Sequence, residues 1–74
     1  MTKGEYRVGV DFNPSKNPEV DKLKAAAAEL IDLISEIDDK GENEIKRLKA
    51  LAATEVETGA MYAVKAATKK PEAS

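Results

Sequence analysis

The chain lacks cysteine, histidine and tryptophan, and its 74 residues include one phenylalanine and two tyrosines. Without cysteine it forms no disulfide bond, and without cysteine and histidine it cannot build the usual zinc sites. The absence of histidine also removes imidazole as a general base. A chain of this length forms at most one domain, and a core that small is marginal on its own. We therefore expect self-association to supply the missing stability.

Long apolar runs and enzymatic motifs are also missing. No segment approaches the roughly 20 apolar residues that span a bilayer, and the N-terminus has no apolar signal core, so we expect a soluble intracellular protein. There is no phosphate-binding glycine loop and no Ser/His or Cys/His pair. The paired carboxylates Asp38/Asp39 and Glu55/Glu57 suit solvated helix surfaces and turns. The sequence therefore predicts neither catalysis nor a cofactor.

Net charge is small and unevenly distributed. The formal charge of −2 supplies no overall basic field for a DNA or RNA polymer. Residues 19–39 are mainly acidic, whereas residues 46–70 are mainly basic. Two interpretations are open: an acidic helix pairs with a basic one, or each helix has its own solvated face.

Alanine-rich helical segments fill most of the chain. Asn17 is a good N-cap for a helix with Pro18 at its first position, and the helical pattern continues to about Asp38. Apolar residues follow each other at intervals of three and four, as in a coiled-coil seam. They are Val20, Leu23, Ala27, Leu30, Ile34 and Ile37. Ile31 and Leu33 widen this stripe, so we expect the helix to meet more than one partner.

A charged turn separates this helix from a second one. Gly41 suits a left-handed C-terminal cap, and Asn43 suits the N-cap of a helix over about residues 44–68. The predicted seam of that helix contains Ile45, Leu48, Ala52, Val56, Gly59, Ala63 and Ala66. Because glycine costs roughly 1 kcal/mol relative to alanine within a helix, Gly59 indicates close backbone approach, room for a ligand, or simple tolerance.

The predicted fold class is all-α. Residues 1–17 form a short N-terminal arm, which the alternation of Val8, Val10 and Phe12 predicts to be extended. Residues 18–70 form an antiparallel two-helix hairpin, and residues 71–74 form a flexible tail. Two helices cannot bury a two-sided apolar stripe, so the hairpin should assemble into a closed homo-oligomer, at least a dimer.

A few side chains could bind a ligand that carries rings and phosphates. Tyr6 and Phe12 could each stack on a planar ring, and Lys24 could pair with a phosphate. Arg47 offers a planar fork for phosphate oxygens, and Thr54 offers a hydroxyl. Taken singly, Phe12 also suits a hydrophobic staple, and both cations also suit a solvated surface.

Four segments together resemble a known family. They are Val8–Ser15, Leu23-Lys24, Glu29–Leu33 and Thr54–Lys65. Over about residues 6–68 the chain resembles the small phage anti-CBASS proteins that act as cyclic-oligonucleotide sponges. These share a helical hairpin domain with the Thoeris anti-defence sponges.

This resemblance implies a homo-hexamer of hairpins in the host bacterial cytoplasm. It implies that cyclic dinucleotides bind between protomers and cyclic trinucleotides at separate three-fold sites, without cleavage. It assigns Phe12 or Tyr6 to base stacking and Lys24 to a phosphate of the dinucleotide. It assigns Arg47 and Thr54 to the trinucleotide. The alternatives are a sponge for a cyclic ADP-ribose signal and a structural or partner-binding hairpin.

Overall fold

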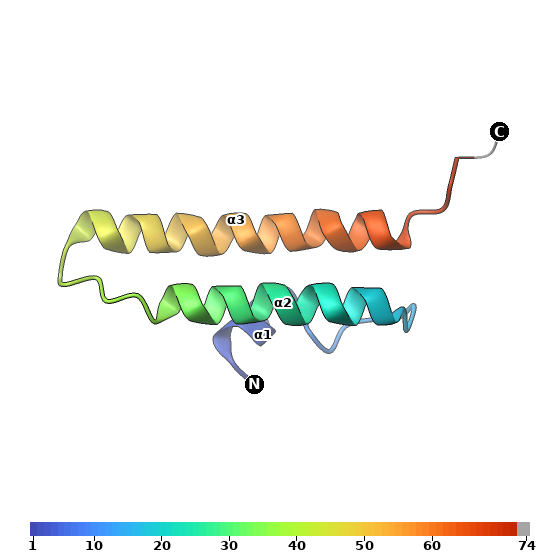
Figure 1. Ribbon diagram of the computed structural model, residues 1–74, viewed down its shortest axis with the longest axis horizontal. Coiled ribbons are helices and arrows are strands. Elements are labelled where there is room, and N and C mark those ends of the chain that lie inside the picture. The colour runs from blue at the N-terminus through green and yellow to red at the C-terminus, as the bar shows by residue number, and fades with distance from the viewer. Residues whose placement is uncertain (73–74) are drawn as a thin grey trace.

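A computed structural model describes residues 1–72, and all of its regular structure within that range is helical. The helices are α1 (Lys3–Val8), α2 (Pro18–Ser35) and α3 (Asn43–Thr68). Figure 1 shows α2 and α3 side by side, joined by a turn at one end, with α1 against the hairpin. The predicted all-α class and helical hairpin are thus confirmed. The tail predicted over 71–74 is described only as far as residue 72.

The N-terminal segment differs from the prediction. Residues 3–8 form the short helix α1 rather than an extended strand. A capping box starts this helix, because the Glu5 amide donates to Thr2 Oγ1 at 3.1 Å and the Thr2 amide donates to Glu5 Oε1 at 2.7 Å. Gly9, with φ of 66°, ends it in the left-handed conformation. The alternation of apolar residues was therefore the wrong signal here.

Close contact through a glycine docks α1 onto α2. Gly4 is buried, and its amide donates to Asp32 Oδ1 at 2.8 Å. A Cβ atom at Gly4 would lie 2.0 Å from the carbonyl oxygen of Ala28, so no larger residue fits without movement. Arg7 Nε also donates to Glu57 Oε1 of α3 at 2.7 Å. The α1 part of the arm therefore packs against both α2 and α3.

The start of α2 follows the prediction. The Glu19 amide donates to Asn17 Oδ1 at 2.8 Å, and Pro18 occupies the first turn. Asn17 Nδ2 also donates to the Ala67 carbonyl oxygen at 3.4 Å, so the beginning of α2 lies beside the end of α3. One asparagine thus both caps α2 and ties it to its neighbour.

The end of α2 and the following turn differ in detail. α2 ends at Ser35 rather than Asp38. The carboxylates of Asp38 and Asp39 accept hydrogen bonds from the amides of Lys40 (2.9 Å) and Gly41 (2.8 Å), which competes with continued helix. Gly41 is left-handed (φ 74°), as expected, but it lies within the turn and does not cap α2.

The N-cap of α3 was wrongly assigned to Asn43. Asn43 is the first helical residue of α3, and Glu42 occupies the N-cap position without a side-chain hydrogen bond to the helix. α3 otherwise covers the predicted segment and ends at Thr68. The long regular helix therefore needs no strong cap to define where it begins.

The buried face of the hairpin is rotated from the predicted seams. The buried apolar residues are Val20, Ala28, Ile31 and Ala53, whereas Leu30 and Leu48 of the predicted seams are 47% and 50% exposed. α1 covers the Ala28 side of α2, so the face that packs is not the one with the most leucine and isoleucine. A Cβ at Gly59 would meet no atom within 4 Å, so no close approach occurs there within the chain.

Charge does not join the two long helices through direct ion pairs. Within residues 1–72, the ion pairs are Arg7–Glu57 between α1 and α3 and Arg47–Glu44 within α3. Lys49 instead donates to the carbonyl oxygens of Ser35 (3.1 Å) and Ile37 beyond the end of α2. The described chain therefore fits the interpretation of separately solvated faces. None of its helices is long and apolar enough to cross a membrane.

Candidate functional site

A cavity between the arm, α2 and α3 brings Phe12 and Lys24 together. Its volume is about 350 Å³. Besides those two residues it is lined by Val8, Glu57, Ala60, Met61 and Val64. We call it the Phe12–Lys24 cavity. Before the structure, the family resemblance was the one reason to place these two side chains in the same site.

Main-chain carbonyls hold the Lys24 side chain in this cavity. Lys24 is only 7% exposed, and its Nζ donates to the carbonyl oxygens of Gly9 (2.9 Å) and Phe12. Those carbonyls converge because the Phe12 amide folds back to donate to Gly9 at 2.9 Å. An ammonium group has three N–H donors, so two carbonyl acceptors leave one for another partner.

The Phe12 ring is positioned by the same lysine but remains accessible. Lys24 Nζ lies 5.3 Å from the centroid of the ring, within the range of a cation–π contact. The ring is 71% exposed, and Met61 on the facing helix is 68% exposed. The cavity thus presents one cation, one exposed aromatic ring, an apolar wall and the Glu57 carboxylate, whose charge is paired with Arg7. This combination can hold a planar ring joined to an anionic group.

Tyr6 lies apart from this arrangement. Its side chain is 78% exposed on α1. It does not line the Phe12–Lys24 cavity. Of the two aromatic candidates, Phe12 is the one that the fold places beside Lys24.

The two residues predicted to contact a trinucleotide have different partners. Arg47 Nε and Nη2 donate to the two carboxylate oxygens of Glu44 at 2.8 and 2.7 Å. These hydrogen bonds raise the pKa of Arg47 and lower the pKa of Glu44. Thr54 Oγ1 instead accepts from Arg7 Nη2 at 3.4 Å. Within one chain, then, Arg47 and Thr54 do not share a binding partner.

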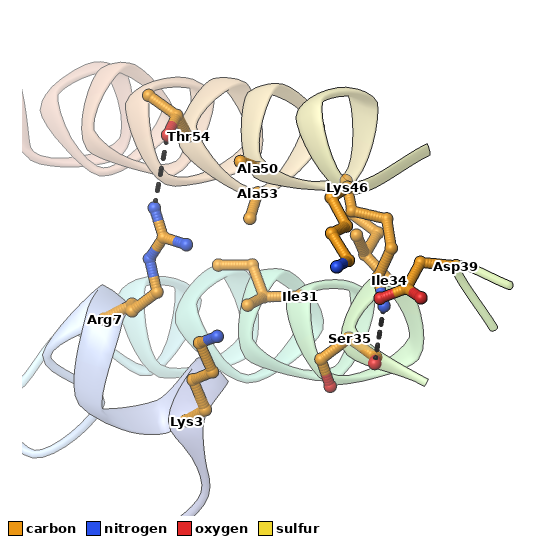
Figure 2. Close-up of a pocket in the computed structure, with 11 residues that line it drawn as sticks. Lys3, Arg7, Ile31, Ile34, Ser35, Asp39, Lys46, Ala50, Ala53 and Thr54 are labelled. Carbon is orange, nitrogen blue, oxygen red and sulfur yellow. Dashed lines mark hydrogen bonds between the residues drawn. The ribbon is translucent and has the colours of Figure 1, made fainter. Parts of the chain in front are cut away.

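A second cavity, of about 320 Å³, lies between all three helices (Figure 2). We call it the three-helix cavity. Four cationic side chains line it together with the Asp39 carboxylate, and they are Lys3, Arg7, Lys46 and Lys49. This site was not predicted from the sequence, because residues 1–17 were expected to be extended. The Thr2/Glu5 capping box was the available signal, because a helix there puts Lys3 and Arg7 on one face.

Metal binding has no visible basis in the described part of the chain. Residues 1–72 contain no group of three or more acidic, histidine or cysteine side chains that could hold a metal ion. The two cavities are lined instead by cations, hydroxyls, the carboxylates of Glu57 and Asp39, and the Phe12 ring.

The family comparison agrees with a binding site. The family model of the Acb2/Tad1 hairpin domain matches residues 4–68, which include the hairpin and all of α1 except Lys3. Comparison with curated proteins and with solved structures gave no match. Because the family match covers well over half of the 74 residues, the chain belongs to the Acb2/Tad1 hairpin-domain family, and this membership implies a sponge-type anti-defence role that depends on binding.

Proposed function

We propose that the protein is a non-enzymatic phage anti-defence protein that sequesters the cyclic di- and trinucleotide messengers of CBASS immunity in the host cytoplasm. The observation that carries this proposal is the position of the Lys24 ammonium group 5.3 Å from the exposed Phe12 ring. Lys24 would meet a phosphate, and Phe12 would stack on a base. Sequestration lowers the free messenger by binding alone.

These contacts would each contribute to the binding energy. Stacking of one base on an aromatic side chain contributes about 1–3 kcal/mol. A charge-assisted hydrogen bond from Lys24 to a phosphate adds to it and fixes the ligand's orientation. Met61 and Val64 supply apolar surface on the opposite wall of the cavity. A cyclic dinucleotide has two bases and two phosphates, so two copies of the cavity related by a two-fold axis would match it.

Assembly is part of the proposal. Within residues 1–72, one chain buries four apolar side chains, while several large apolar residues remain about half exposed or more: Leu30, Leu33, Ile37, Leu48, Leu51, Met61 and Tyr62. A homo-oligomer of antiparallel hairpins, with six copies as the family resemblance implies, would cover them. In that assembly Arg47 and Thr54 from different protomers would contact a trinucleotide, and Arg47 would exchange Glu44 for a phosphate.

Isothermal titration calorimetry with cyclic di- and trinucleotides tests the proposal. Phe12→Ala should weaken cyclic dinucleotide binding by at least about 30-fold, because a ligand held between two copies of the cavity loses two stacking contacts of about 1–3 kcal/mol each. Tyr6→Ala is the matched control, because it removes an equally exposed aromatic outside the cavity. Equal losses in both variants, or unchanged affinity in Phe12→Ala, would contradict the assignment of Phe12.

A second candidate ligand is a cyclic ADP-ribose signal. The matched family covers Acb2 and Tad1 alike, so membership does not distinguish these ligands. Thermal-shift measurements with both ligand classes separate them, because only a molecule that binds the folded state raises the melting temperature by mass action. The absence of a shift with every cyclic nucleotide would favour a structural or partner-binding hairpin instead.

A further inference from the structure

The three-helix cavity concentrates positive charge from distant parts of the chain. Lys3 and Arg7 come from α1, and Lys46 comes from the first turns of α3. Figure 2 shows Lys3 and Lys46 on opposite sides of the cavity, with Ile31 between them. Ile31 is 1% exposed and forms part of the cavity's apolar lining. The positive charges therefore surround a cavity whose lining includes the buried Ile31 side chain, and they are not scattered over a convex surface.

Two of these cations have no partner within the described chain. Arg7 is paired with Glu57, and Lys49 donates to two main-chain carbonyls at the end of α2. Within residues 1–72, by contrast, the side chains of Lys3 and Lys46 make neither a hydrogen bond nor an ion pair. Asp39 contributes the one carboxylate that lines the cavity. The four lining cations outnumber this carboxylate, and their like charges repel each other, so an anion would stabilise the arrangement.

We propose that the three-helix cavity is a second ligand site, which binds the phosphate groups of a small molecule. Lys3 and Lys46 would each donate to phosphate oxygens from opposite sides, and Arg7 would donate through the guanidinium N–H groups that Glu57 and Thr54 leave unused. No aromatic side chain lines this cavity, so the phosphates, and not a base, are what it recognises.

This site is separate from the proposed cyclic dinucleotide site. The two cavities share no lining residue. Thr54 is the single residue of the three-helix cavity that we have also assigned to a trinucleotide contact, so the test does not use it. The inference therefore does not rest on the proposed cyclic dinucleotide site and can fail or succeed independently of it.

A titration of the ¹⁵N-labelled full chain with pyrophosphate, followed by NMR, tests the inference. We expect saturable amide shifts around Lys3, Ile31 and Ala53, which lie on the three helices that surround the cavity. The double variant Lys3→Gln/Lys46→Gln should bind pyrophosphate at least about tenfold more weakly, because each lost charge-assisted contact costs several-fold in affinity. Both lysines are exposed, so the variant should keep its fold, which circular dichroism checks.

The matched control is Lys22→Gln/Lys40→Gln, which removes the same charge from two exposed lysines outside the cavity. It should change the pyrophosphate affinity by no more than about twofold, as expected for exposed charges screened by solvent and salt. Equal weakening in the two double variants would overturn the proposal, as would shifts centred elsewhere or no saturable shift.

Two further measurements keep the site distinct. ADP should bind with the same affinity as pyrophosphate to within about threefold, because no ring lines the cavity to stack on its base. A much tighter ADP complex would overturn recognition by phosphate alone. Pyrophosphate-induced amide shifts centred on Phe12 and Lys24 would show that the anion binds in the Phe12–Lys24 cavity instead.

Discussion

Lys24 is a buried lysine whose ammonium group is held by main-chain carbonyls. The sequence suggested a ligand contact or a surface charge, and the fold shows a third role, since the side chain ties the Gly9–Phe12 segment to α2. A substitution here changes the arm and the proposed phosphate contact together. Lys24 is for this reason a poor single test of binding, and Phe12, which leaves the main chain of the arm intact, is a better one.

Replacement of Lys24 by methionine should lower the free energy of unfolding. The variant keeps most of the buried methylene chain and removes the ammonium donor, so the loss should be about 2 kcal/mol, typical of a hydrogen bond from a charged group. Urea denaturation measures it, and heteronuclear NOEs for residues 9–13 should fall as the segment is released. Unchanged stability would mean that these carbonyl contacts do not hold the arm.

Gly4 is the residue whose replacement should be least tolerated. In Gly4→Ala the new Cβ would meet the Ala28 carbonyl oxygen at 2.0 Å, so α1 must shift and the bond to Asp32 must weaken. We expect a loss of about 1–3 kcal/mol in the free energy of unfolding, as for other overpacked sites, measured by chemical denaturation.

Gly59→Ala is the matched control for this prediction. A Cβ at Gly59 meets nothing within 4 Å in the chain, so better helix propensity should raise stability by up to about 1 kcal/mol. A loss of stability at Gly59 would instead indicate that another copy of the chain approaches α3 there. A Gly4→Ala variant as stable as the wild type would contradict the docking described for α1.

At the scale of elements, the two long helices form where local sequence signals predict them, whereas the short helix α1 depends on tertiary contacts. The start of α2 was predictable because Asn17 and Pro18 act within one turn of the chain. The end of α2 was harder to predict, because the carboxylates of Asp38 and Asp39 form turn hydrogen bonds that compete with the helix. α1 has only six residues, too few to be stable alone, and its capping box suffices because Gly4 and Arg7 dock it.

The cap of α2 gives a test at this scale. Asn17→Ala should lower the free energy of unfolding by about 1 kcal/mol, since the Glu19 amide loses its acceptor. Asn17→Asp keeps the acceptor but loses the amide donor to Ala67. Its free energy of unfolding should lie between those of the wild type and Asn17→Ala. Thermal or urea denaturation measures both variants. An Asn17→Asp variant as unstable as Asn17→Ala would show that the bond to α3, and not the cap, matters at this position.

At the scale of the whole molecule, the balance of buried and exposed apolar surface is the main fact. Val20, Ala28, Ile31 and Ala53 make a thin core, while Leu33 and Leu51 are 54% and 46% exposed. Surface of this kind on so small a chain favours association, because a single chain of this size buries little area and is only marginally stable on its own. The proposed assembly follows from this excess.

Analytical ultracentrifugation should therefore find a homo-oligomer at micromolar concentration. Leu33→Glu/Leu51→Glu should lower the oligomer mass, because two buried carboxylates per chain would lack partners in the interface. Lys22→Glu, which adds negative charge at an exposed site, is the control and should leave the mass unchanged. A folded wild-type monomer would contradict the proposed assembly and leave the two-fold match between ligand and cavity without support.

The sequence by itself determined the all-α class, the two long helices and the first turn of α2. Helix periodicity and capping act over a few residues, so they can be recognised from the sequence without knowledge of the tertiary structure. Only the tertiary structure decided which helix face is buried. It also placed the Lys24 ammonium group beside the Phe12 ring, and Lys3 and Lys46 around one cavity. Those facts depend on α1 docking through Gly4, a contact between residues 28 positions apart that leaves no local pattern in the sequence.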